Sequence, residues 1–210
     1  EYDRIGVCHY RRYFADDTHK VLLERDFEMI FDEYDIVTLK PGEAPVSMEE
    51  YYRRCHNIED LNITRRALKK VAGEYAGTMN EVFSGKVSCG ANMMVCSHEL
   101  FNEYCQWLFA ILFEAKKHID VSGYDEYHAR VYGFLAEYLM NVWIRHKGLK
   151  VYGAEMYMAG EKAETAELKA ELDTLVRERS YTEARNVYFD RMQRRPDVAL
   201  PESDPGDELH

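Results

Sequence analysis

The chain has 210 residues, of which 46% are hydrophobic and 31% charged, a composition typical of a soluble domain that can bury a core without disulfides or metals. Its formal net charge of −11 argues against a nucleic acid as the principal partner, because a phosphate backbone requires a cationic surface. Its five cysteines include no C-x-x-C pair, so we expect free thiols in a reducing compartment and no zinc site.

Strand and helix signals alternate through the first 158 residues. Runs of β-branched residues bounded by glycine or proline predict strands, and apolar residues repeating every three or four positions predict helices. The expected strands cover residues 4–9, 34–40, 87–97 and 149–158, and the expected helices cover residues 22–31, 48–56, 57–71, 100–115 and 131–142. This alternation favours an α/β fold with a mixed sheet flanked by helices.

Local signals mark three helix starts. Ser47 and Glu50 form a capping box, Asn57 can cap the following helix, and Ser180 and Glu183 form a second capping box.

Aromatic side chains are frequent in the helices expected over residues 100–115 and 131–142. At helical spacing such residues are usually core, and we interpret them so. They are Tyr104, Trp107, Phe109, Phe113, Phe134, Tyr138 and Trp143.

The composition changes after Gly160. Residues 161–179 are good helix formers with charges of alternating sign, and the next helix should end before Pro196. We therefore expect an α/β domain over residues 1–158, a C-terminal helical hairpin over residues 159–195, and a disordered tail over residues 196–210.

One segment carries a family resemblance. Residues 5–14, Ile-Gly-Val-Cys-His-Tyr-Arg-Arg-Tyr-Phe, closely resemble the signature of DUF4422, a domain-of-unknown-function family of capsular and exopolysaccharide glycosyltransferases. Further similar segments follow in the family's order over residues 34–41, 56–61, 92–109 and 130–137. One departure is Tyr138, where the family pattern usually has arginine after Glu137, and the family's first strand and helix, expected to hold much of the nucleotide, would lie upstream of Glu1.

The resemblance implies a GT-A-like, Rossmann-related fold and an enzyme that transfers a hexose, with galactose or galactofuranose as candidates, from a nucleotide-sugar donor to a glycan or lipid-linked glycan acceptor. It also implies a cytoplasmic protein with peripheral association at the inner membrane face. Self-association through the C-terminal helices is a further expectation. A non-catalytic glycan-binding or scaffold module derived from this fold is the alternative.

The segment that begins at His9 suggests how a leaving diphosphate could be stabilised. The sequence contains no Asp-x-Asp, the motif that holds a metal in many GT-A enzymes, so nothing in it supports a divalent metal or another cofactor. Arg11 and Arg12 could replace the metal, because one guanidinium group can bind two phosphate oxygens at once. His9 lies nearby in the sequence. Structural salt bridges at the edge of the sheet are the alternative interpretation.

Glu137 is the first candidate for the catalytic base. It is expected to follow a glycine-containing turn and to start an apolar helix, where burial can raise the pKa of a carboxyl group. A carboxylate that only complements the helix dipole is an equal alternative.

Three more residues are candidates for substrate contacts. His56 and Asp60 stand four positions apart and could orient each other or a sugar hydroxyl, with Asp60 assisting catalysis, or form only a local hydrogen bond. Asn92 follows Gly90, which permits close backbone approach to a sugar, although an ordinary strand-end amide fits as well.

Overall fold

The computed structural model describes residues 2–160 and 163–194. The chain divides into two compact units, Glu1–Tyr157 and Met158–His210, which are described separately. None of the described helices combines the length and the apolar character needed to cross a bilayer.

The first unit is built on a five-stranded sheet with the order β1-β6-β3-β7-β2. Its strands are β1 (Arg4–Val7), β2 (Arg12–Ala15), β3 (Ile36–Leu39), β6 (Met94–Ser97) and β7 (Val151–Met158). Strand β6 runs antiparallel to both β1 and β3, and β7 runs parallel to β3. The carboxyl ends of β1, β3 and β7 therefore lie at the same edge of the sheet. A separate two-stranded ribbon pairs β4 (Gly42–Glu43) with β5 (Val87–Ser88).

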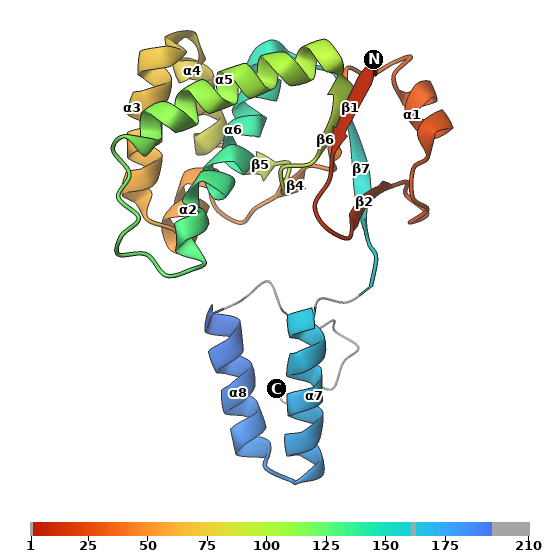
Figure 1. Cartoon of the computed structure of the whole chain (residues 1–210), viewed down its shortest axis with the longest axis vertical. Coiled ribbons are helices and arrows are strands. Elements are labelled where there is room, and N and C mark those ends of the chain that lie inside the picture. The colour runs from red at the N-terminus through yellow and green to blue at the C-terminus, as the bar shows by residue number, and fades with distance from the viewer. Residues whose placement is uncertain (1, 161–162, 195–210) are drawn as a thin grey trace. The chain divides into compact units, whose positions relative to one another are not determined.

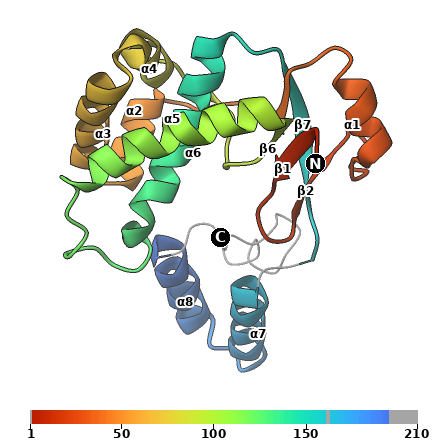
Figure 2. The ribbon, with the colours of Figure 1, turned by 45° about the horizontal axis from the view of Figure 1, so that its top comes forward.

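Helices cover both faces of this sheet. Helices α2–α6 lie on one side and α1 lies on the other (Figure 1 and Figure 2). Their bounds are α1 Glu24–Ile30, α2 Met48–Cys55, α3 Ile58–Val71, α4 Ala76–Ser84, α5 His98–Lys116 and α6 Val131–Lys147, with single 3₁₀ turns at Gly73–Tyr75 and His128–Arg130. This mixed α/β arrangement confirms the predicted fold class.

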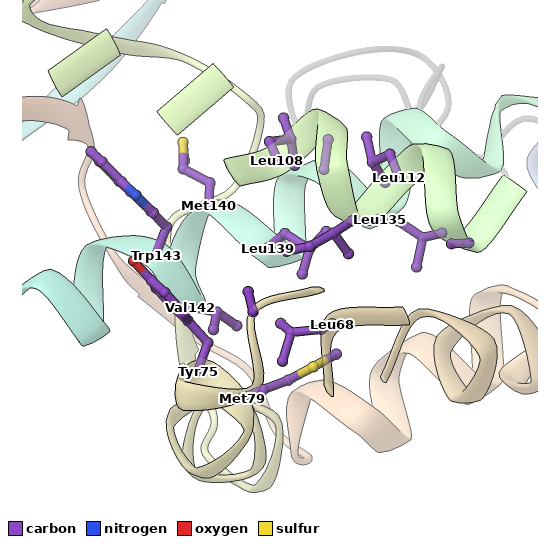
Figure 3. Packing of buried hydrophobic residues seen from close by; sticks show 14 of the residues in the cluster. Leu68, Tyr75, Met79, Leu108, Leu112, Leu135, Leu139, Met140, Val142 and Trp143 are labelled. Carbon is purple, nitrogen blue, oxygen red and sulfur yellow. The ribbon is translucent and has the colours of Figure 1, made fainter. Parts of the chain in front are cut away.

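Alternating residues of one strand supply two cores. Ile36 belongs to the larger core beneath α2–α6, whereas Val37 belongs to the smaller core that includes Phe27 of α1. Successive strand residues point to opposite faces, so neighbouring residues such as Ile36 and Val37 are both apolar in a sheet that is covered on both sides. In the larger core, side chains from α3, α4, α5 and α6 converge, among them Leu68, Met79, Leu108 and Leu135 (Figure 3).

Two of the three predicted helix caps form. The Ser47 hydroxyl accepts a hydrogen bond from the Glu50 N–H at 3.2 Å, and the Asn57 side chain accepts one from the Glu59 N–H at 3.0 Å. Each cap satisfies an amide that the first helical turn leaves without a backbone partner.

The strand predicted over residues 87–97 is interrupted. Residues 87–88 pair with β4 and residues 94–97 join the main sheet, so the two short strands belong to different sheets. Between them Ala91 has a left-handed backbone with φ of 59°. A β-propensity pattern does not reveal this bend, because long-range contacts hold it.

Two of the seven aromatic residues interpreted as core are exposed. Phe109 is 47% exposed and Phe113 is 63% exposed, and their rings stack on each other with centroids 5.8 Å apart. Both lie on the face of α5 that points away from α3 and α6.

The second unit contains two helices, α7 (Ala163–Arg177) and α8 (Tyr181–Arg194), in the predicted hairpin. Leu168 and Leu172 of α7 pack against Ala184 of α8. The predicted tail over residues 196–210 lies outside the described residues.

Candidate functional site

A cavity of about 630 Å³ opens at the carboxyl edge of the sheet. Its wall combines the end of β3, the middle of β7, both strands of the β4–β5 ribbon, and residues of α2 and α6, including Tyr51, Glu137, Tyr138 and Asn141. Open α/β sheets bind ligands outside the carboxyl ends of their strands, and the volume is within the usual range for a small-molecule site.

Glu137 reaches this cavity from within a helix. It lies in the second turn of α6, which begins at Val131, and Gly133 is itself helical. The expectation that Glu137 follows a turn and starts the helix was wrong, and the dipole interpretation loses its basis because that interaction is confined to the first turn. Burial raises the pKa of Glu137, while the charges of Arg12 and Arg130 and a hydrogen bond from the Ala91 N–H oppose the rise.

His9 and Arg12 enclose the turn that follows β1. The Arg12 N–H donates to the His9 carbonyl at 3.1 Å, and Arg12 Nη1 lies 3.4 Å from His9 Nδ1. Burial lowers the pKa of His9, and the charges of Arg12 and Arg130 lower it further. The imidazole is therefore neutral near pH 7 and can accept a hydrogen bond from the guanidinium.

Arg11 lies in the same turn with a left-handed backbone, φ of 62°. Its guanidinium carbon is 5.9 Å from the centroid of the Tyr10 ring, which is 89% exposed. The residues that line the cavity at the carboxyl edge include neither Arg11 nor Arg12.

His56 lies in an aromatic environment. Its ring stacks on Phe134 with centroids 4.3 Å apart and contacts Tyr52 with centroids 4.9 Å apart. Burial and the charge of His128 lower the pKa of His56 to about 4. Its Nδ1 and the Tyr52 hydroxyl are both buried without a hydrogen-bond partner in the described part of the protein.

Asp60 has a partner other than His56. Its Oδ2 accepts a hydrogen bond of 2.6 Å from the Tyr124 hydroxyl, which in turn accepts one of 2.8 Å from the Asn57 amide. Burial raises the pKa of Asp60, and the bond from Tyr124 counteracts this. No hydrogen bond joins Asp60 to His56 in the part of the chain that the structure describes, so the expected mutual orientation of the two side chains was wrong.

Asn92 connects the sheet to a helix. Its side-chain oxygen accepts a hydrogen bond of 3.1 Å from the Tyr104 hydroxyl of α5. This contact fixes the turn before β6. Substrate roles for Asn92, His56 and Asp60 stay predictions.

The structure brings two more residues to the site. Asn141 lines the cavity one helical turn after Glu137, and the charge of Arg130 reaches both His9 and Glu137. Arg130 opens the similar segment over residues 130–137, which was a usable signal, whereas nothing local distinguishes Asn141 in its apolar helix. Tyr138, at the position where the family usually has arginine, stacks on Phe83 with centroids 5.5 Å apart.

Across residues 2–160 and 163–194, no group of three or more histidine, cysteine, aspartate or glutamate side chains is arranged to hold a metal ion.

Comparison with known proteins agrees with this fold. The apo structure of the bifunctional glycosyltransferase WbbM superposes with a TM-score of 0.65 at 24% identity, over 77% of this chain and 34% of that one. The chain thus spans about a third of that protein, and the likeness shows a glycosyltransferase-like fold. No curated protein matches. The family model described as a domain of unknown function, DUF4422, matches residues 1–148, and the chain therefore belongs to the DUF4422 family.

Proposed function

We propose that this chain is part of a glycosyltransferase that moves a hexose from a nucleotide-sugar donor to a glycan acceptor. The observation that carries the proposal is the position of Glu137, whose half-buried carboxyl group lines a cavity at the carboxyl edge of the sheet. The positive charges of Arg12 and Arg130 act on this carboxyl group. The fold shared with WbbM supports the same class of reaction.

The proposed reaction breaks the bond between the anomeric carbon and the diphosphate oxygen and forms a bond from that carbon to an acceptor oxygen. Glu137 takes the proton of the acceptor hydroxyl in an inverting transfer, for which a raised pKa makes it a stronger base. The nucleoside diphosphate leaves with the electron pair of the broken bond. Arg11 and Arg12, with His9 beside them, stabilise its charge without a metal.

The finer parts of the proposal derive from the family resemblance. We propose capsular or exopolysaccharide acceptors, galactose or galactofuranose as the sugar, and a cytoplasmic protein that acts at the inner membrane face. The C-terminal hairpin is the proposed surface for self-association.

A binding and turnover experiment tests the proposal. Uridine diphosphate at about a hundred times its Kd should raise the Tm by roughly 5–10 °C, because a ligand that binds only the folded state stabilises it. Release of nucleoside diphosphate from a panel of nucleotide hexoses should persist in EDTA and fall about a hundredfold or more in Glu137→Gln.

The Glu137→Gln variant has an internal control. The pKa of Glu137 is raised in the fold, so its ionised form destabilises the protein at pH 7, and glutamine should raise the Tm while turnover falls. If no nucleoside diphosphate shifts the Tm, the scaffold alternative holds.

A further inference from the structure

Arg130 lies on the same face of α6 as two residues that line the cavity. Residues 130, 134, 137 and 141 follow a spacing of three and four positions, which places them along one face of α6. Glu137 and Asn141 on this face line the cavity, and the Arg130 guanidinium carbon lies 5.7 Å from the centroid of the Phe134 ring. The face therefore runs from the cavity to the guanidinium of Arg130.

Arg12 approaches the same place from the sheet. It is the first residue of β2, and its guanidinium contacts the His9 imidazole at 3.4 Å. The charges of Arg12 and Arg130 both act on His9 and on Glu137, so the two arginines, 118 positions apart, are near the same two side chains.

These guanidinium groups are not neutralised by structural ion pairs. In the described part of the chain, neither Arg12 nor Arg130 forms a salt bridge within 4.0 Å, although most other arginines of the first unit pair with a carboxylate. Arg130 also precedes α6 as its N-cap without a side-chain capping bond, a position where a cation is unfavourable to the helix. Its guanidinium carbon lies 6.0 Å from the Tyr127 ring centroid and 5.7 Å from that of Phe134, so aromatic rings rather than carboxylates hold it and its charge remains available to an anion.

We infer that Arg12 and Arg130 together bind the diphosphate of the donor, with Arg130 supplying the second guanidinium beside Arg12. The inference rests on the proposed function and names a residue outside the His9–Arg12 turn. Two guanidinium groups that approach from different elements can each bind two oxygens of one phosphate. The Glu137 carboxylate, on which both charges act, lines the adjacent cavity, where the sugar would lie.

Inorganic pyrophosphate is a direct probe of this site, because it carries the diphosphate without base or sugar. Calorimetric titration at low salt should give a Kd that rises at least tenfold in Arg12→Gln and in Arg130→Gln. Arg130→Lys should recover part of the loss, since an ammonium group keeps the charge without the paired geometry. Arg145→Gln is the matched control and should leave the Kd unchanged, because it removes the same charge from the exposed far end of α6, about 22 Å along the helix.

Two outcomes would overturn the inference. One is a Kd for pyrophosphate in Arg130→Gln that stays within twofold of the unmodified chain, and the other is an equal loss in Arg145→Gln. A Tm of Arg130→Gln that is no lower than that of the unmodified chain shows that the variant is folded.

The inference and the proposed function can fail separately. Pyrophosphate binding that depends on Arg130, without release of nucleoside diphosphate from any nucleotide hexose, would keep the anion site and reject the transferase. Turnover in Arg130→Gln equal to that of the unmodified chain would keep the transferase and reject the role of Arg130. Absence of binding to both pyrophosphate and uridine diphosphate would reject both.

Discussion

The side chain of Asn141 binds both backbone polar groups of Cys89. The Cys89 N–H donates to Asn141 Oδ1 at 2.7 Å, and Asn141 Nδ2 donates to the Cys89 carbonyl at 3.2 Å and to the Glu137 carbonyl at 2.9 Å. A residue of α6 thus takes the place of a strand partner where β5 ends. This link holds the bend whose Ala91 N–H donates to Glu137.

We predict that Asn141→Asp lowers the free energy of unfolding by about 2–3 kcal/mol, because a carboxylate would face two carbonyl oxygens that now receive hydrogen bonds. Urea unfolding followed by circular dichroism measures the change. Asn102→Asp is the control, since the exposed Asn102 side chain bonds only to His98 in the described residues and should change stability by less than about 0.5 kcal/mol. Equal effects of the two substitutions would contradict the proposed link.

His56 makes the fold sensitive to acid. Its pKa is lowered from 6.5 to about 4, chiefly by burial, so the unfolded chain binds a proton at a higher pH than the folded chain does. The stability contributed by neutral His56 is therefore complete above pH 6.5 and is lost progressively as the pH falls towards 4.

We predict that His56→Phe, which keeps the stacking on Phe134, loses about 5 °C less in Tm between pH 7 and pH 5 than the unmodified chain does. Differential scanning calorimetry at both pH values tests this. His19→Asn is the control, because His19 lies in an exposed turn with a left-handed backbone that asparagine also adopts, and it should show the unmodified pH response. An identical response in His56→Phe would show that other groups cause the acid sensitivity.

The Tyr124 hydroxyl donates the hydrogen bond that stabilises the buried carboxylate of Asp60. We predict that Tyr124→Phe lowers the free energy of unfolding by about 1–3 kcal/mol, because it removes a donor from a buried charge. In an Asp60→Asn background the same substitution should cost about half as much, since a neutral amide needs the donor less. A double-mutant cycle by urea unfolding gives the coupling.

Tyr157→Phe is the matched control for Tyr124→Phe. Tyr157 is 42% exposed, so loss of its hydroxyl should change stability by less than about 0.5 kcal/mol. If Asp60→Asn does not reduce the cost of Tyr124→Phe, the negative charge of Asp60 adds nothing to the strength of the bond between the two side chains.

Local patterns in the sequence were sufficient for much of the architecture. Ser47 and Asn57 cap helices as predicted, because a capping side chain needs only amides two or three residues away. The apolar run at Ile36 and Val37 predicted a strand, and the ordered segments similar to DUF4422 predicted the family.

The predictions that failed depended on contacts between distant residues. The bend at Ala91 is held by Asn141 and Glu137 of α6. The strand pattern over residues 87–97 cannot predict these contacts, because both residues lie far away in the sequence. Phe109 and Phe113 have helical spacing, but which face of α5 is covered depends on where α3 and α6 pack.

The sequence by itself therefore determined most helices, most strands and the family, and it singled out His9, Arg12 and Glu137 as candidates. Only the tertiary structure decided that Arg130 accompanies Arg12 near Glu137, and that His56 and Asp60 have separate partners. The physical reason is range: capping and periodicity act over a few residues, whereas a site at the carboxyl edge of a sheet exists only after strands and helices far apart in the chain have packed together.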